Sequence, residues 1–215
     1  MRPLHWIFDL DNTLHIASRH AFPVIDRAMT EWLQQQLAVD HHTANHLRVS
    51  YWQRYGATLL GLRRHHPELN PHTFLRACHP FAELGMALHP MPRLRSTLLQ
   101  LAGDKYLFTN GPAEYGRWML GQLGIADLFT GIAGIDTVGL RPKPQRLAFL
   151  QMSRHFAVPL RDCIMVEDSI DNLQMARRLG MHTVWLSPGR QRHPAAQHQI
   201  RHLHQLTQLN ARLMR

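Results

Sequence analysis

Short apolar runs alternate with longer amphipathic segments over most of the chain. Four runs have the length and the branched or aromatic content of buried strands, at residues 5–8, 105–109, 163–167 and 183–187. Between them, apolar residues recur at helical spacing, which predicts helices over 91–102, 113–123, 145–156 and 172–179. Strands that alternate with helices indicate an α/β fold, a parallel sheet with helices on both faces.

Residues 15–88 do not follow this alternation. Helical patterns cover 25–37 and 44–55, a broken region follows, and a short helix is expected near Phe74. We therefore predict an α/β core from residues 1–14 and 89–215, with a helical cap, residues 15–88, inserted after the first strand. At the C-terminus, helical apolar spacing predicts an amphipathic helix that packs on the core or, alternatively, binds a partner, through Ile200, Leu203, Leu206, Leu209 and Leu213.

Composition narrows the possible classes of protein. The 215 residues are 45% hydrophobic and 18% charged, which is typical of a globular domain with a small insert. No apolar run reaches the roughly 18 residues of a membrane helix, and Asp9 and Asp11 interrupt the segment where a signal peptide would be apolar. We expect a cytoplasmic protein without a membrane partner, in which Cys78 and Cys163 are reduced, buried thiols.

The chain has a formal net charge of +9, and Lys105 and Lys143 are its only lysines. Such a charge suits nucleic acid or small anionic substrates, because net charge governs steering rather than fold. No block of five or more basic residues occurs, which argues against nucleic acid. Small anionic substrates therefore match the positive charge of the chain better than nucleic acid does.

Two carboxylates, Asp9 and Asp11, follow the first predicted strand. In open parallel sheets, ligands bind beyond the carboxyl ends of the strands, and alternation points both carboxylates to the same side. Like charges this close raise each other's pKa and destabilise the fold unless a positive charge compensates. The pair therefore indicates a cation site, a phosphate chemistry, or both.

The sequence TNGP follows the second predicted strand and begins a helix, since Pro112 suits a first helical turn. Free backbone amides at a helix start bind anions. We expect those of Asn110 and Gly111, together with the Thr109 hydroxyl, to bind phosphate oxygens.

A third strand end is expected at RPKP, where two prolines fix the backbone around Lys143. This side chain would supply a positive charge for a phosphate and for a nucleophile. The fourth strand end, VEDSIDN, adds three carboxylates and a side-chain amide, namely Glu167, Asp168, Asp171 and Asn172. An acidic cluster in a basic protein is stable mainly with a hard cation such as Mg²⁺.

Each motif alone is common in turns and helix caps, but the four in this order favour an active site. Together they resemble the haloacid dehalogenase-like phosphohydrolases, over nearly the whole chain. The resemblance implies a Rossmann-like core and a phosphomonoesterase in which Asp9 is the nucleophile that forms an aspartyl-phosphate. Asp11 would act as general acid and then base, and Thr109 and Lys143 would bind the phosphoryl oxygens. Mg²⁺ would be held by Asp9, the backbone carbonyl of Asp11 and Asp168.

Asp11 points to phosphate rather than halide, because dehalogenases of this superfamily lack an aspartate two residues after the nucleophile. Glu167 departs from the paired aspartate often seen in the fourth motif, which puts its metal role in doubt. Within the superfamily, YWQRYGATLLGL at 51–62, FLRACH at 74–79 and the strand end FTNG resemble the pyrimidine 5′-nucleotidase group.

This second resemblance implies a small phosphorylated substrate, a nucleoside 5′-monophosphate, with Tyr51 and Tyr55 facing its base or sugar. Alternatively, both rings pack within the cap. A phosphatase for sugar phosphates or phosphoglycolate would use the same machinery. The alternative from another class is a non-catalytic nucleic-acid-binding protein on the same fold. The sequence does not determine the preferred base or sugar, or the oligomeric state.

Overall fold

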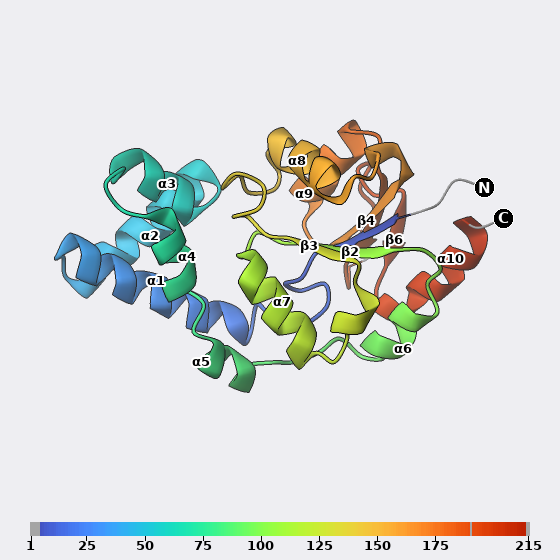
Figure 1. Ribbon diagram of the computed structural model, residues 1–215, viewed down its shortest axis with the longest axis horizontal. Coiled ribbons are helices and arrows are strands. Elements are labelled where there is room, and N and C mark those ends of the chain that lie inside the picture. Colours follow the sequence, from blue (N-terminus) through green and yellow to red (C-terminus); the bar gives the residue numbers. More distant parts are fainter. Residues whose placement is uncertain (1–4, 190, 214–215) are drawn as a thin grey trace. The chain divides into compact units, whose positions relative to one another are not determined.

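The computed structural model describes residues 5–189 and 191–213, and its backbone divides into two units (Figure 1). The core unit comprises Met1–Ile16 and His89–Arg215, and the cap unit comprises Ala17–Leu88. The sequence pattern of strands and helices predicts the boundaries of the cap after residues 14 and 88. The cap unit is inserted between the first two strands of the core unit.

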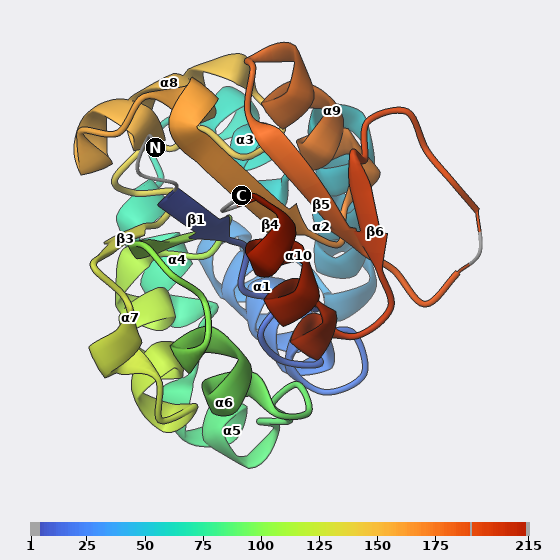
Figure 2. The same ribbon diagram turned by 90° about the vertical axis from the view of Figure 1, so that its right-hand side faces the viewer.

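The core unit contains a six-stranded sheet in the order β3-β2-β1-β4-β5-β6, in which all neighbouring strands are parallel (Figure 2). The strands are β1 (His5–Phe8), β2 (Lys105–Phe108), β3 (Gly131–Ala133), β4 (Cys163–Glu167), β5 (His182–Leu186) and β6 (His198–Ile200). β1 lies between β2 and β4, with Phe8 beside Leu107 and Val166. The predicted α/β fold with a parallel sheet is confirmed.

Helices cover both faces of this sheet (Figures 1 and 2). One face carries α8 (Arg146–Phe156) and α9 (Ile170–Arg178), and the other carries α6 (Leu94–Leu99), α7 (Ala113–Gln122) and α10 (Leu206–Leu213). Short 3₁₀ turns lie at Ala126–Leu128, Leu160–Asp162 and Leu203–Gln205. Every residue of β2 and β4 is buried, as expected for strands covered on both faces.

Alternate strand residues form the core beneath α8 and α9. Ile7, Phe108 and Met165 pack there with Phe149 and Leu173, and all five are completely buried. The rings of Phe108 and Phe149 meet edge to face with centroids 5.3 Å apart, a favoured aromatic arrangement. This packing holds the central strands, whose carboxyl ends carry the candidate site.

The edge strands β3 and β6 were not predicted. β3 has only three residues and β6 is mostly polar, so neither shows the alternation of apolar and polar residues that predicts a strand. The C-terminal prediction is wrong in part, because Ile200 belongs to β6 and the helix α10 begins only at Leu206. Hydrogen bonding to a neighbouring strand, which local spacing does not encode, decides the state of Ile200.

The cap unit is helical, and all of its residues are described. It contains α1 (Ala21–Leu37), α2 (His41–Tyr55), α3 (Thr58–His65), α4 (Pro71–Ala77) and α5 (Phe81–Met86). Asp40 caps α2 by accepting a hydrogen bond from the Thr43 amide across 3.0 Å. Gly61 lets α3 approach α2, because a Cβ there would lie 2.3 Å from Cγ of Tyr51. The broken region of the sequence thus contains α3, and α5 was not predicted.

Across 5–189 and 191–213, every helix falls short of the length and apolar character that crossing a bilayer requires.

We expect both cysteines to be unreactive in the folded protein. Cys78 and Cys163 are free and buried; burial raises the pKa of the Cys163 thiol to about 12 and that of Cys78 further still. Since the thiolate is the nucleophile, Ellman's reagent should label neither residue between pH 7 and 9, and both after unfolding in guanidinium. Labelling of the native protein at the rate of a free thiol would contradict this burial.

Candidate active site

Three adjacent strands bring polar side chains to the carboxyl edge of the sheet. Asp9 follows β1, Thr109 follows β2, and Glu167 ends β4. The Asp9 amide donates to the Val166 carbonyl across 3.0 Å, and the Thr109 amide donates to that of Ala133 across 3.0 Å. These bonds continue the strand ladders and fix the backbone of both residues.

A buried lysine links the three strands. Lys143 Nζ donates to Asp9 Oδ1 (2.6 Å), Glu167 Oε2 (2.9 Å) and the Phe108 carbonyl (2.9 Å). The sequence predicts that Lys143 lies at a strand end. In the structure β3 ends at Ala133, and Lys143 lies in the loop that leads to α8. A long, flexible side chain reaches the strand ends from this loop.

Asn110 holds the backbone of Lys143. Its Nδ2 donates to the Lys143 carbonyl across 3.1 Å, and the Lys143 amide donates to Asn110 Oδ1 across 2.7 Å. The TNGP motif predicts that the backbone amide of Asn110 binds phosphate oxygens. The structure shows that its side chain positions the lysine loop, a role that local sequence does not signal.

Glu167 has hydrogen-bond donors at both carboxylate oxygens. Oε1 accepts from the amides of Asp168 (3.1 Å) and Ser169 (3.2 Å), while Oε2 accepts from Asn172 Nδ2 (3.0 Å) and from Lys143. Asn172 belongs to the fourth motif, but no role was predicted for it. These contacts hold the buried carboxylate at the start of α9.

Negative charge exceeds positive charge among these buried groups. Burial and the nearby Glu167 raise the pKa of Asp9 to about 7, although Lys143 opposes this shift. Burial likewise raises the pKa of Glu167 to about 7 and raises that of Asp168. Burial disfavours the charge of Lys143, but Asp9 and Glu167 outweigh it and raise the lysine pKa. One ammonium therefore faces three carboxyl groups.

The carboxylate oxygens of Asp9, Glu167 and Asp168 lie within 4.8 Å of one another, the one such group found among the described residues. Closely spaced carboxylates with excess negative charge suit a hard cation such as Mg²⁺. Two expected ligands, Asp9 and Asp168, belong to this group, and Glu167 adds a third oxygen. The side chain of Asp11 does not belong to it; the expectation for Asp11 concerned its backbone carbonyl.

The predicted anion site at the start of α7 requires correction. The Gly111 amide is not free, because it donates to Thr109 Oγ1 across 3.0 Å, and the Ala113 amide donates to Asp136 Oδ1 across 2.8 Å. Asp136 lies in the loop after β3, and no motif indicated its role as a helix cap. Thr109 Oγ1 accepts from Gly111, so its own hydroxyl hydrogen can still be donated to a ligand.

Asp11 has different surroundings from Asp9. Its Oδ1 accepts a hydrogen bond from the Tyr115 hydroxyl across 3.0 Å and lies 2.9 Å from His15 Nε2. Burial and the nearby Asp11 carboxylate raise the pKa of Tyr115 well above its usual value, so the phenol remains a donor. No sequence motif indicated Tyr115 or His15.

Tyr51 and Tyr55 contact histidines of the cap unit. The Tyr51 hydroxyl lies 2.9 Å from His66 Nε2, and that of Tyr55 lies 2.7 Å from His65 Nε2. The Tyr51 ring is 8% exposed and stacks on His65 with centroids 5.3 Å apart. These contacts match the alternative in which both tyrosines pack within the cap.

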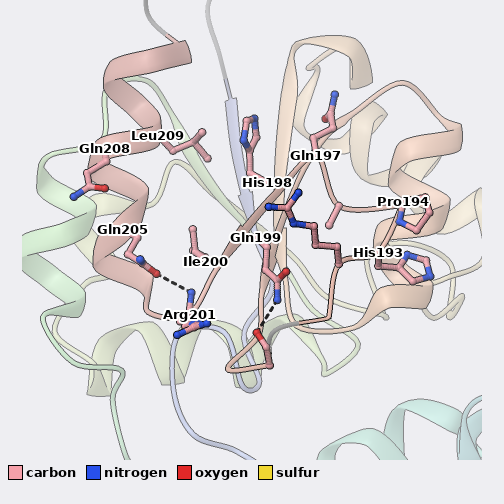
Figure 3. Close-up of a pocket in the computed structure, with 13 residues that line it drawn as sticks. His193, Pro194, Gln197, His198, Gln199, Ile200, Arg201, Gln205, Gln208 and Leu209 are labelled. Atoms are coloured by element: carbon pink, nitrogen blue, oxygen red, sulfur yellow. Dashed lines mark hydrogen bonds between the residues drawn. The ribbon is translucent and has the colours of Figure 1, made fainter.

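A groove of about 1090 Å³ lies along β6 and α10, outside the candidate active site (Figure 3). Its polar side chains satisfy nearby backbone groups: Gln205 Oε1 accepts from the Arg201 amide (2.7 Å), and Gln199 Nε2 donates to the Gly189 carbonyl (3.0 Å). None of the clustered carboxylates or Lys143 lines this groove. The candidate site at the strand ends is therefore separate from this groove.

Several known proteins resemble this chain in sequence or in fold. A model of the haloacid dehalogenase-like hydrolases matches residues 5–180. Phosphate metabolism protein 8 of Saccharomyces cerevisiae is 31% identical over 137 residues, 59% of this chain, and the match spans only 42% of that protein. A phosphoglycolate phosphatase of Yersinia pseudotuberculosis is 30% identical over 195 residues, 85% of this chain and 80% of that enzyme. CbbY of Rhodobacter sphaeroides, solved with xylulose-(1,5)bisphosphate, shares the fold, with a TM-score of 0.69 and 18% identity over 95% of this chain and 96% of that one.

We expect Mg²⁺ to raise the unfolding temperature, because a cation held by the folded carboxylate group stabilises only the folded state. At a hundredfold excess over Kd, such binding contributes about 2.7 kcal/mol. Calorimetry in MgCl₂ and in EDTA measures the shift, which Asp168→Asn should largely remove. Asp171→Asn is the matched control, since Asp171 is exposed in the first turn of α9. An equal shift in Asp168→Asn and the parent would contradict the site.

Proposed function

The chain belongs to the haloacid dehalogenase-like hydrolase family, and we propose that it is a Mg²⁺-dependent phosphatase that cleaves small phosphomonoesters through an aspartyl-phosphate on Asp9. The contact that supports this most directly is the 2.6 Å bond between Asp9 Oδ1 and the buried ammonium of Lys143. A carboxylate can approach an anionic phosphoryl group only where positive charge screens their repulsion. Lys143 supplies that charge at the nucleophile itself.

In the first step, an Asp9 carboxylate oxygen forms a bond to phosphorus as the bond to the leaving oxygen breaks. Lys143 holds Oδ1 and so orients the carboxylate. The Thr109 hydroxyl donates to a phosphoryl oxygen, and the positive charge of the Lys143 ammonium beside Asp9 stabilises the negative charge of the phosphoryl group. Mg²⁺ held by Asp9, Asp168 and the backbone carbonyl of Asp11 would supply further positive charge against the phosphoryl group.

Asp11 is the general acid of the first step and the general base of the second. As an acid it donates its proton to the leaving oxygen, which departs as an alcohol. The resulting Asp11 carboxylate then takes a proton from the water that attacks phosphorus in the aspartyl-phosphate. Inorganic phosphate leaves, and Asp9 and Asp11 return to their starting states.

The proposed substrate is a small phosphorylated acid or sugar, such as phosphoglycolate. A phosphoglycolate phosphatase matches 85% of this chain, and the structural neighbour CbbY was solved with a sugar bisphosphate. The cap motif implied a nucleotide, with Tyr51 and Tyr55 at the base or sugar. The hydroxyl groups of both tyrosines pair with histidines instead, so no contact favours a base over a small carbon skeleton.

Release of inorganic phosphate tests this function. We expect the protein to release phosphate from phosphoglycolate or a triose phosphate faster than from UMP or CMP, and only with Mg²⁺. Asp9→Asn should reduce turnover by at least about a thousandfold, since it removes the nucleophile. Its circular dichroism spectrum should match that of the parent.

Asp171→Asn, with an exposed carboxylate changed, should retain full activity and controls for the loss of one acidic group. Turnover by Asp9→Asn at the parental rate would refute the nucleophile. A preference for UMP or CMP would make the substrate a nucleotide, and no release from any ester would refute the phosphatase.

A further inference from the structure

The Asp11 carboxylate is held through one of its two oxygens. The Tyr115 hydroxyl and His15 Nε2 both contact Oδ1, at 3.0 and 2.9 Å. Both partners are completely buried, whereas 19% of the Asp11 side chain is exposed. Within the described part of the chain, no hydrogen bond reaches Oδ2. The two oxygens of this carboxylate therefore have different surroundings.

The other ring nitrogen of His15 identifies the tautomer. Nδ1 is buried and has no hydrogen-bond partner among the described residues. A neutral imidazole carries one N–H. If that hydrogen were on Nδ1, a buried donor would lack an acceptor, and the Nε2 lone pair would face the Asp11 carboxylate at 2.9 Å. The hydrogen therefore belongs on Nε2, which donates to Oδ1.

Oδ1 thus accepts two hydrogen bonds, one from a phenol and one from an imidazole. From this geometry we propose that Tyr115 and His15 are positioning residues that direct the transferable proton of Asp11 to Oδ2. The proposal rests on the proposed function, in which Asp11 is the general acid. A proton on Oδ1 would displace one of the two donors and leave it buried without a partner.

Packing within the core unit fixes both positioning residues. The Tyr115 ring lies against Gly111, where a Cβ would come within 2.7 Å of the ring Cδ1. The glycine of the TNG motif therefore makes room for the ring that holds Asp11. His15 is held by bridges of its backbone to Asp11 and to Pro90. Both donors consequently reach Oδ1 from rigid surroundings.

This arrangement predicts a dependence on the leaving group. An alkoxide is a poor leaving group and needs the proton of the general acid, whereas p-nitrophenolate leaves readily without one. Hydrolysis of the aspartyl-phosphate is common to all esters, so the comparison uses kcat/KM, which reports the steps up to its formation. If Oδ2 is misoriented, kcat/KM should fall much more for alkyl phosphates than for p-nitrophenyl phosphate. Loss of structure alone would slow both esters alike.

Tyr115→Phe removes the hydroxyl and keeps the ring. We expect kcat/KM for the best alkyl phosphomonoester to fall about 10- to 100-fold, within the usual contribution of a general acid. For p-nitrophenyl phosphate, kcat/KM should change less than about threefold. Tyr106→Phe is the matched control, because it removes the hydroxyl of another buried tyrosine of the core unit, on β2, and should leave the ratio of the two rates unchanged.

Two His15 variants test the second donor. His15→Gln keeps an N–H donor close to the position of Nε2, so the ratio of alkyl to aryl rates should stay near that of the parent. His15→Leu removes the donor and should lower this ratio as Tyr115→Phe does. Thermal unfolding of each variant reports whether the fold is retained, and Tyr115→Phe carries the test if His15→Leu does not fold.

Equal losses for the alkyl and aryl esters in Tyr115→Phe would overturn the positioning role and reduce the contact to packing. An unchanged rate for both esters would overturn it as well. In either case the parent remains a phosphatase, so the proposed function stands. If the parent cleaves neither ester, the proposed function fails, and the positioning role of Tyr115 and His15 fails with it.

Discussion

A buried ammonium group connects the polar ends of the three central strands. Lys143 Nζ contacts Asp9 after β1, the carbonyl of Phe108 at the end of β2, and Glu167 at the end of β4. Without it, two buried carboxylates would face each other uncompensated, and breaking such a buried pair costs about 3–5 kcal/mol. Asn110 in turn holds the backbone of Lys143. One connected network of hydrogen bonds therefore joins Lys143 to Asn110, Asp9, Glu167 and Asn172.

The two carboxylates of the DLD sequence have different surroundings, which support the different roles proposed for them. Asp9 is buried beside an ammonium and two further carboxylates, which suits a nucleophile that works next to a cation. Asp11 is partly exposed and contacts two donors, Tyr115 and His15, which suits a group that gains and loses a proton. Similar residues two positions apart acquire distinct chemistry from their neighbours.

The central strands could be predicted, whereas the edge strands could not. β1, β2 and β4 are covered on both faces, so burial requires continuous apolar runs that are visible in the sequence. Gly131–Ala133 and His198–Ile200 each have three residues and are less buried. These segments become strands because they form hydrogen bonds with the neighbouring strand. That dependence produces no alternation of apolar and polar residues within the segments themselves.

The sequence by itself determined which chemical groups gather at the edge of the sheet, because Asp9, Thr109 and Glu167 each come at the end of an apolar run. Only the tertiary structure decided which atoms they contact. Tyr115 and Asp11 are 104 positions apart, and Asn110 and Lys143 are 33 apart. Local patterns reflect burial and backbone geometry, whereas these contacts arise when distant segments pack together.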